Sequence, residues 1–321
     1  MRLLPGPRTA RLATLPRMNA DTRPAHAADR LLAAIEAKRS PVCVGLDPVF
    51  EKLPRSLLPD QIGAHDDSIN RSEALREFCG GVIEAVAPFV PCIKIQSACF
   101  ERYQRGGFQT FMTTHWAHQR GLHVILDAKR GDIGVSAEHY AAGAFDDVVP
   151  GEDSANPDWL TINSYLGEDG ITPFLRDGHG AFALVRTSNP GGDQVQNLEL
   201  KDGRTVAQAV GEMVARIGFK HVGSRGYSSL GAVVGATKPQ DARRLREIMP
   251  QQIFLVPGYG AQGAGLDDIM PCFKSDGSGA IVTASRSVIY AFRPDDPKWA
   301  DSVGDAAARF ADEVGRAAGM R

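Results

Sequence analysis

The chain has 321 residues, of which 43% are hydrophobic and 23% are charged, so it is long enough for one large core or for two domains. Its formal net charge of -2 leaves no excess of positive charge, which argues against nucleic acid or a membrane surface as a partner. The apolar runs are all shorter than the ~20 residues that a membrane helix needs. These properties favour a globular protein that acts on a small molecule.

The five cysteines indicate a reducing compartment. Their number is odd, they form no CxxC pair, and several lie inside apolar runs. Packed, reduced thiols of this kind are typical of cytoplasmic proteins.

The first 25 residues are expected to be an N-terminal extension that precedes a single domain over residues 26–321. Residues 1–23 contain five arginines and one acid, Asp21, without an apolar stretch long enough for a secretory signal. An arginine-rich leader of this composition is compatible with a transit peptide. Disorder, or a start at Met18, explains it more simply, and we expect order to begin near His26.

Eight short apolar runs, separated by segments with helical spacing, predict the fold. The expected strands are 42–46, 92–96, 123–127, 159–163, 182–186, 231–235, 253–257 and 279–283. Helices are expected at 71–86, 100–120, 136–146 and 205–218, with an extra helix at 27–38 before the first strand and a closing helix within 296–319. Strands rich in Val, Ile and Leu that alternate with helices indicate a covered parallel sheet. Eight such units predict an α/β fold, a (β/α)8 TIM barrel, rather than a doubly wound sheet.

In such a barrel the reactive groups lie just beyond the C-terminal ends of the strands. The third strand ends in the sequence Asp127-Ala-Lys129-Arg130-Gly131-Asp132. Asp127 and Lys129 point to the same side of an extended backbone, Arg130 points away, and Gly131 permits a turn that returns Asp132 toward the same pocket. For an isolated Asp-x-Lys, a structural salt-bridge network is the favoured explanation. Two acids around one lysine, with Lys94 on the neighbouring strand, favour a lysine held charged as a proton donor.

The last two strands are followed by groups suited to a phosphate. A glycine-rich segment, 258–263, follows strand seven and includes Gln262, while Ser285 and Arg286 follow strand eight. Backbone N–H groups and a guanidinium both bind phosphate oxygens well. A tight turn is the alternative for the glycine-rich segment alone, and the arginine one strand later favours phosphate.

Two further strand ends leave alternatives open. Ser188, after strand five, is able to hydrogen-bond a planar amide edge or to close a local turn. Asp47, after strand one, is able to bind a sugar hydroxyl or to cap the following turn. The eight histidines are scattered without metal-ligand spacing, so no metal or other cofactor is expected.

These blocks resemble orotidine 5'-phosphate decarboxylase, in its longer bacterial branch (type 2). The resemblance rests on 127–133, and on 44–48, 93–96, 187–190, 234–237, 257–263 and 284–287 in the expected order, and it extends from about His26 to the C-terminus. It implies a cofactor-free homodimer that converts orotidine 5'-phosphate to uridine 5'-phosphate, the last step of de novo UMP synthesis. Two positions depart from the family pattern: Ser136 stands where threonine is common, and Ser164 stands where the branch usually has proline.

The resemblance also assigns roles. Lys129 would protonate the ring carbon that loses carbon dioxide, Asp127 would lie beside the substrate carboxylate, and Asp132 would come from the partner subunit. The remaining assigned positions are substrate contacts: Lys94 and Asp47 at the ribose, Ser188 at the pyrimidine amide, Gln262, Ser285 and Arg286 at the phosphate, and Ser136 through its hydroxyl.

Two other functions stay open. One is a keto-sugar-phosphate decarboxylase of the same superfamily that uses magnesium. Such enzymes carry an acid on strand two as a metal ligand, whereas Lys94 at that place would repel a divalent ion. The other is a non-catalytic barrel that binds a phosphoribosyl ligand, against which the intact acid–lysine–acid set argues.

Overall fold

The computed structural model describes residues 26–58, 68–146, 155–260 and 263–321. The expected extension at 1–25 and the candidate phosphate ligand Gln262 lie outside the described residues. Within the described part of the chain, no helix is both long and apolar enough to cross a membrane.

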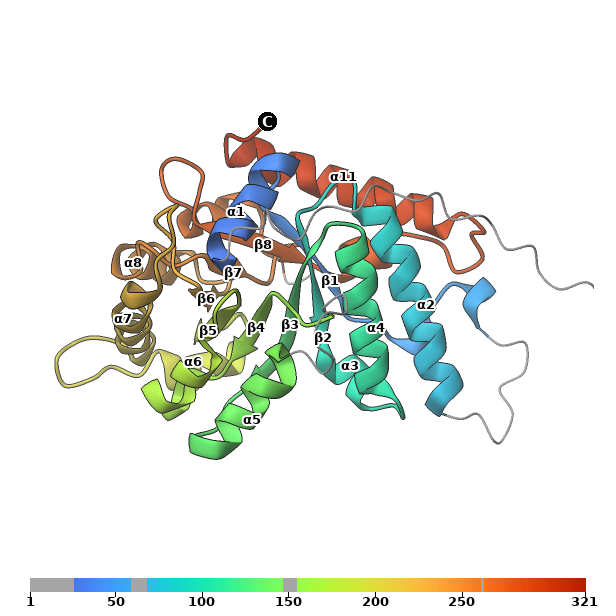
Figure 1. The fold of residues 1–321 in the computed structure, drawn as a ribbon. Coiled ribbons are helices and arrows are strands. Elements are labelled where there is room, and N and C mark those ends of the chain that lie inside the picture. Colours follow the sequence, from blue (N-terminus) through green and yellow to red (C-terminus); the bar gives the residue numbers. More distant parts are fainter. Residues whose placement is uncertain (1–25, 59–67, 147–154, 261–262) are drawn as a thin grey trace, which may run out of the picture.

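The predicted barrel is confirmed. Eight parallel strands pair in sequence order, and β8 closes on β1. In Figure 1 the strands occupy the centre and the helices surround them. The strands are β1 Val42–Leu46, β2 Cys92–Gln96, β3 His123–Arg130, β4 Trp159–Ile162, β5 Gly180–Arg186, β6 Leu230–Val234, β7 Phe254–Val256 and β8 Ala280–Ala284.

Most of the helices lie in the connections between successive strands, whereas the first precedes β1 and the last two follow β8. They are α1 Ala27–Lys38, α2 Ser68–Val86, α3 Ser97–Glu101, α4 Gly106–Gln119, α5 Gly134–Phe145, α6 Asp193–Gln196, α7 Val206–Gly218, α8 Pro239–Ile248, α9 Leu266–Ile269, α10 Arg286–Ile289 and α11 Trp299–Ala317. Short 3₁₀ turns lie at Phe50–Lys52, Arg55–Leu57, Ser164–Leu166, Glu168–Gly170, Thr172–Phe174, Pro190–Gly192, Phe219–His221 and Met270–Cys272.

One expected helix was wrong. The segment 100–120 is not a single helix, because α3 ends at Glu101 and α4 begins at Gly106. Between them Arg105 has φ 61°, a left-handed conformation that interrupts the helical path. Gly106 follows this bend and packs closely against α3, since a Cβ at Gly106 would lie 2.0 Å from the carbonyl oxygen of Phe100.

Strand alternation divides the core into two parts. Val124, Leu160 and Ile162 face outward and pack in the large cluster under the helices, whereas Ile125 and Trp159 face the barrel interior. The interior cluster also includes Leu31 and Ile35 of α1. The extra N-terminal helix therefore supplies apolar side chains to the barrel interior and leaves the opposite end for polar groups.

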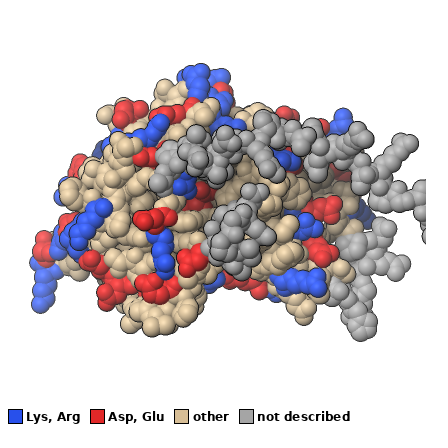
Figure 2. Space-filling model, viewed as in Figure 1, with Lys and Arg blue, Asp and Glu red and all other residues tan. Residues whose placement is uncertain are grey.

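The surface carries both signs of charge. Figure 2 shows Lys and Arg interspersed with Asp and Glu over the face in view, without a continuous basic stripe among the described residues. This distribution agrees with the formal net charge of -2 and gives no electrostatic footprint for nucleic acid on that face.

Asp158, just before β4, ties together three elements at the N-terminal end of the barrel. Its carboxylate accepts hydrogen bonds from Arg30 of α1 at 2.8 Å, from His118 of α4 at 3.1 Å and from the backbone N–H of Val124 at 2.9 Å. Burial opposes its charge, but His123 and His118 outweigh that effect and hold the pKa of Asp158 well below its usual value.

We expect Asp158→Asn to lower the free energy of unfolding by about 3 kcal/mol at pH 7, because it removes the buried carboxylate that pairs with Arg30 and His118. A depressed pKa stabilises the fold above the unfolded value of about 3.9, and this contribution is lost as the pH falls further. The difference in the free energy of unfolding between wild type and variant, measured by urea unfolding, should therefore become smaller below about pH 4. Asp305→Asn, at an exposed position, is the matched control and should change stability by less than about 0.5 kcal/mol. A gap that widens in acid would contradict this account.

Candidate active site

The C-terminal ends of the strands enclose a pocket of about 400 Å³. Its walls include seven of the ten residues expected from the sequence. These are Asp47, Lys94, Asp127, Lys129, Ser188, Ser285 and Arg286. Since they come from five different strands or the loops after them, the barrel closure is what brings them together.

Asp127 is the centre of the charged part of this pocket. Its Oδ2 lies 2.8 Å from Lys94 Nζ and its Oδ1 lies 2.6 Å from Lys129 Nζ. Lys94 also lies 3.4 Å from Asp47 Oδ1. The carboxylate of Asp127 thus binds both lysines, and the carboxylate of Asp47 lies next to Lys94, the more deeply buried lysine.

Burial and pairing decide the charges of this array. Burial disfavours the ammonium of Lys94, but Asp127 and Asp47 outweigh it and raise the pKa of Lys94 above its usual range. Burial also disfavours the carboxylate of Asp127, and Lys94 and Lys129 outweigh it, so the pKa of Asp127 lies well below its usual value. Both groups therefore stay charged at neutral pH.

The two lysines differ in access to the pocket. The side chain of Lys94 is 8% exposed, whereas that of Lys129 is 48% exposed. Lys94 is consequently fixed among carboxylates, and Lys129 is the ammonium that an entering molecule reaches.

The backbone at Lys129 departs from the expected turn. Lys129 itself has φ 47°, a conformation that non-glycine residues seldom adopt, whereas Gly131 has no positive φ. Gly131 instead packs closely, since a Cβ there would lie 3.1 Å from Cβ of Asn163. The expectation that Gly131 provides the turn was wrong, and the strained residue is Lys129, whose ammonium pairs with Asp127.

Asp132 and Ser136 are not among the residues that line this pocket. The Asp132 carboxylate accepts the backbone N–H of Ile133 at 2.8 Å, and Ser136 is exposed on the first turns of α5. Asp132 therefore does not return to its own chain's pocket as the sequence suggested. Arg130 points away as expected and pairs with Glu101 at 2.5 Å.

The side of the pocket opposite the lysines is made by the last two strands. Gly258 and Tyr259 follow β7, and Ser285 and Arg286 follow β8. Gly258 has φ 104°, which favours glycine. Gly45 of β1 leaves room for Ser285, because a Cβ at Gly45 would lie 1.9 Å from Ser285 Oγ.

Thr161 of β4 is a site residue that the sequence analysis missed. Its hydroxyl donates to Asp127 Oδ1 at 2.8 Å and accepts the backbone N–H of Lys129 at 3.0 Å. Thr161 is 1% exposed. Its side chain points into the barrel, as does that of Trp159, which lies two residues earlier on the same strand. A lone hydroxyl on the inward face of an apolar strand was the available signal.

Ser164, at the position where the resembled branch usually has proline, also has a definite partner. Its hydroxyl donates to the backbone carbonyl of Leu184 on β5. The neighbouring Asn163 caps the following 3₁₀ turn by accepting the N–H of Tyr165 at 3.0 Å. The loop after β4 is thus held by hydrogen bonds.

Comparison with known proteins gives a consistent result. Residues 40–297 match the family model described as the orotidine 5'-phosphate decarboxylase / HUMPS family. The chain is 40% identical to the orotidine 5'-phosphate decarboxylase of Rhodopirellula baltica, covering 86% of this chain and 94% of that one, and 37% identical to that of Caldicellulosiruptor bescii, covering 83% and 90%. Among solved structures, OMP decarboxylase of Leishmania donovani superposes with a TM-score of 0.69 at 29% identity, covering 91% of this chain and 98% of that one.

We expect Thr161→Val to lower the free energy of unfolding by about 2 kcal/mol, because the isosteric change leaves the buried N–H of Lys129 without a partner. Thr283→Val is the matched control. Thr283 is also a buried pocket threonine, but its hydroxyl donates only to the carbonyl of Val256 at 3.3 Å, so its loss should cost about 1 kcal/mol or less. Equal losses for the two variants in urea unfolding would contradict a special role for Thr161.

Proposed function

Because the chain belongs to the orotidine 5'-phosphate decarboxylase family, we propose that it converts orotidine 5'-phosphate to uridine 5'-phosphate with Lys129 as the proton donor. The observation that carries this assignment is the Lys94–Asp127–Lys129 array, with distances of 2.8 and 2.6 Å, at one side of a pocket that also contains Arg286. The five cysteines are free thiols, which supports a cytoplasmic enzyme.

The reaction breaks the bond between the ring carbon and its carboxylate. The electron pair stays on the ring carbon, carbon dioxide leaves, and a proton from Lys129 then completes the product. A positioned ammonium attracts the negative charge as it develops and supplies the proton afterwards. Both lysines and Asp127 are already in place in the free chain, so little reorganisation is needed when the charge appears.

Asp127 makes the site selective for the transition state. A substrate carboxylate bound beside Asp127 experiences repulsion that decreases as its charge moves to the ring. The array is therefore more complementary to the carbanion than to the bound substrate. Contacts of Arg286 with the remote phosphate supply binding energy that offsets this repulsion.

The keto-sugar alternative is not favoured. Its magnesium ligand on strand two corresponds to Lys94 here, whose ammonium is buried between Asp47 and Asp127. A divalent cation at that position would face a fixed positive charge. We infer that decarboxylation by this chain proceeds without a metal or other cofactor.

We expect Lys129→Ala to reduce turnover by at least about a hundredfold, because loss of a positioned acid typically costs that much. Binding of uridine 5'-phosphate should remain measurable, since Arg286 lies elsewhere in the pocket. The decrease in orotate absorbance measures turnover, and calorimetry measures the binding of uridine 5'-phosphate. Lys220→Ala, at an exposed lysine after α7, should retain wild-type turnover. The proton-donor role would be wrong if Lys129→Ala kept more than about a tenth of the activity.

We infer that the enzyme is a homodimer whose partner supplies Asp132. Apolar side chains are exposed on both sides of the loop that carries Asp132: Ile133 and Val135 are 54% and 74% exposed, and Tyr165 and Leu166 are 83% and 48% exposed. Tyr165 and Leu166 belong to the loop after β4, and this loop contacts the loop that carries Asp132. A Cβ at Gly170 in the loop after β4 would lie 3.1 Å from Leu166 and 3.5 Å from the carbonyl oxygen of Asp132. Exposed apolar side chains gathered in this way indicate an interface.

A mixing experiment tests the shared site. Lys129→Ala and Asp132→Ala are each expected to be inactive, and in their heterodimer both lesions fall in one site while the other site is wild type. With random exchange about half of the dimers are heterodimers, so activity should recover to roughly a quarter of the wild-type value by two-fold symmetry. If Asp132 serves its own chain, mixing recovers nothing. Exchange itself is confirmed with differently tagged chains.

A further inference from the structure

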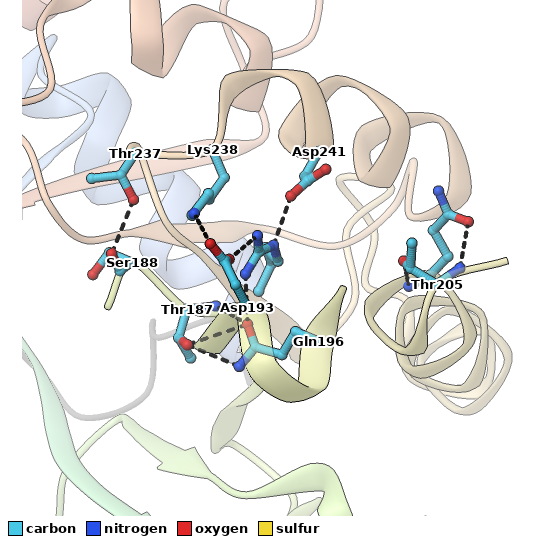
Figure 3. Close-up of polar contacts among 10 residues, drawn as sticks. Thr187, Ser188, Asp193, Gln196, Thr205, Thr237, Lys238 and Asp241 are labelled. Atoms are coloured by element: carbon cyan, nitrogen blue, oxygen red, sulfur yellow. Dashed lines mark hydrogen bonds and ion pairs between the residues drawn. The ribbon is translucent and has the colours of Figure 1, made fainter. Parts of the chain in front are cut away.

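An ion-pair cluster around one buried arginine lies behind the β5 side of the pocket. Arg186, the last residue of β5, is 1% exposed. Its guanidinium donates to Asp193 at 2.6 Å, Asp241 at 2.7 Å and Gln196 at 3.1 Å. Lys238 donates to the other oxygen of Asp193 at 2.7 Å. We call Arg186, Asp193, Gln196, Lys238 and Asp241 the Arg186 cluster, most of which is labelled in Figure 3.

The cluster joins two loops at the mouth of the barrel. Asp193 and Gln196 belong to α6, after β5, while Lys238 and Asp241 lie at the start of α8, after β6. None of its five members is among the residues that line the pocket. The cluster therefore acts on the pocket, if at all, through the residues it holds.

Those residues are the rim that carries Ser188. Gln196 accepts the backbone N–H of Thr187 at 2.9 Å and donates to the Thr187 hydroxyl at 2.9 Å. From the other loop, Thr237 donates to the backbone carbonyl of Ser188 at 3.1 Å. Figure 3 shows Gln196 beside Thr187, and Thr237 pointing to Ser188. The backbone of Thr187 and Ser188 is thus bonded from both sides, and both residues line the pocket.

Close packing completes this constraint. A Cβ at Gly235 would lie 2.8 Å from both N and Cα of Ser188, so the end of β6 touches the Ser188 backbone directly. The amide N–H of Gly235 also donates to the carbonyl of Arg186 at 2.7 Å. Ser188 has little freedom to shift while these contacts persist.

Stability alone does not explain such a cluster. The guanidinium of Arg186 is buried while its carboxylate partners Asp193 and Asp241 are 40% and 41% exposed. Such pairs contribute little net stability, because desolvation of the guanidinium offsets much of the attraction. Here the cluster contains two cations and two carboxylates in fixed geometry. A buried guanidinium whose hydrogen bonds all go to defined partners favours one arrangement of the loops that supply those partners.

We propose that the Arg186 cluster is a positioning device that fixes Ser188 for recognition of the pyrimidine amide edge. This inference rests on the proposed function, in which Ser188 contacts that edge. Arg186 anchors Gln196 and Asp193, Gln196 holds Thr187, and Thr237 holds Ser188. Selectivity for the base therefore depends on residues outside the pocket.

Two nearly isosteric changes at Gln196 test the proposal. Gln196→Met removes every side-chain hydrogen bond of Gln196 to Thr187 and to Arg186. Gln196→Glu keeps an acceptor for the Thr187 N–H, the Thr187 hydroxyl and Arg186. Calorimetry measures the Kd of uridine 5'-phosphate and of ribose 5-phosphate, which lacks the base. We expect Gln196→Met to weaken the binding of uridine 5'-phosphate about tenfold, which corresponds to the loss of about one well-placed hydrogen bond. The Kd of ribose 5-phosphate should change by less than about twofold. Gln196→Glu should stay near wild type for both.

A double-mutant cycle with Ser188→Ala separates positioning from a general structural effect. If Gln196 acts through Ser188, Gln196→Met should have little further effect on uridine 5'-phosphate binding in the Ser188→Ala background. Equal weakening of both ligands by Gln196→Met, or an undiminished effect in the Ser188→Ala background, would overturn the proposal. Thr237→Val, which removes only the bond to the Ser188 carbonyl, is a second variant with the same expected selectivity if Gln196→Met does not fold.

Failure of the proposed function has a different signature. If Ser188→Ala leaves uridine 5'-phosphate binding unchanged, Ser188 does not contact the base, and the contact and the positioning inference fall together. If Ser188→Ala weakens the nucleotide selectively but Gln196→Met and Thr237→Val do not, the contact stands and only the positioning inference is wrong.

Discussion

The carboxylate of Asp127 is the group on which the rest of the site depends. It lies between Lys94 at 2.8 Å and Lys129 at 2.6 Å, and its own side chain is 9% exposed. Without it, two ammonium groups would face each other with no carboxylate between them, and like charges at such short range repel. Asp127 thus makes it possible to hold two positive charges where the proposed reaction would form a carbanion, and the neighbouring Thr161 holds both Asp127 and the backbone of Lys129.

The same constraint recurs wherever the barrel buries a charge, and it is met in two ways. Asp158 and Arg186 are each surrounded by partners of opposite charge or by histidines. Arg246 instead donates to the backbone carbonyls of Met249, Gln252, Cys272 and Gly279, and burial lowers the pKa of its guanidinium to about 10. The carbonyls of Cys272 and Gly279 are 26 and 33 residues from Arg246, so both kinds of partner join separate elements. The Arg186 cluster does so beside Thr187, which lines the pocket.

The sequence predicted the barrel because each strand is an apolar run whose parity assigns its side chains to the interior or to the helices. It predicted Asp127, Lys129 and Lys94 for the same reason, since inward parity near a strand end leads into the pocket. It did not predict the left-handed backbone of Lys129 or the break at Arg105, because an isolated sequence favours glycine there. The Arg186 cluster was also missed. Its members are 55 residues apart at the extremes, and their contacts exist only after β5 and β6 pair.

In the proposed function, the residues that would carry out the reaction and those that would recognise the base are held by separate contacts. The charged array is held by short-range contacts within β2, β3 and β4, and it is complete before any ligand enters. The rim that carries Ser188 is held from outside the pocket by α6 and by the loop that precedes α8. Because the two supports share no residue, the proposed proton donation by Lys129 and the proposed recognition of the base by Ser188 would be able to vary independently. A barrel with separate loops after each strand permits this division, since a change in one loop leaves the strands that carry the lysines in place.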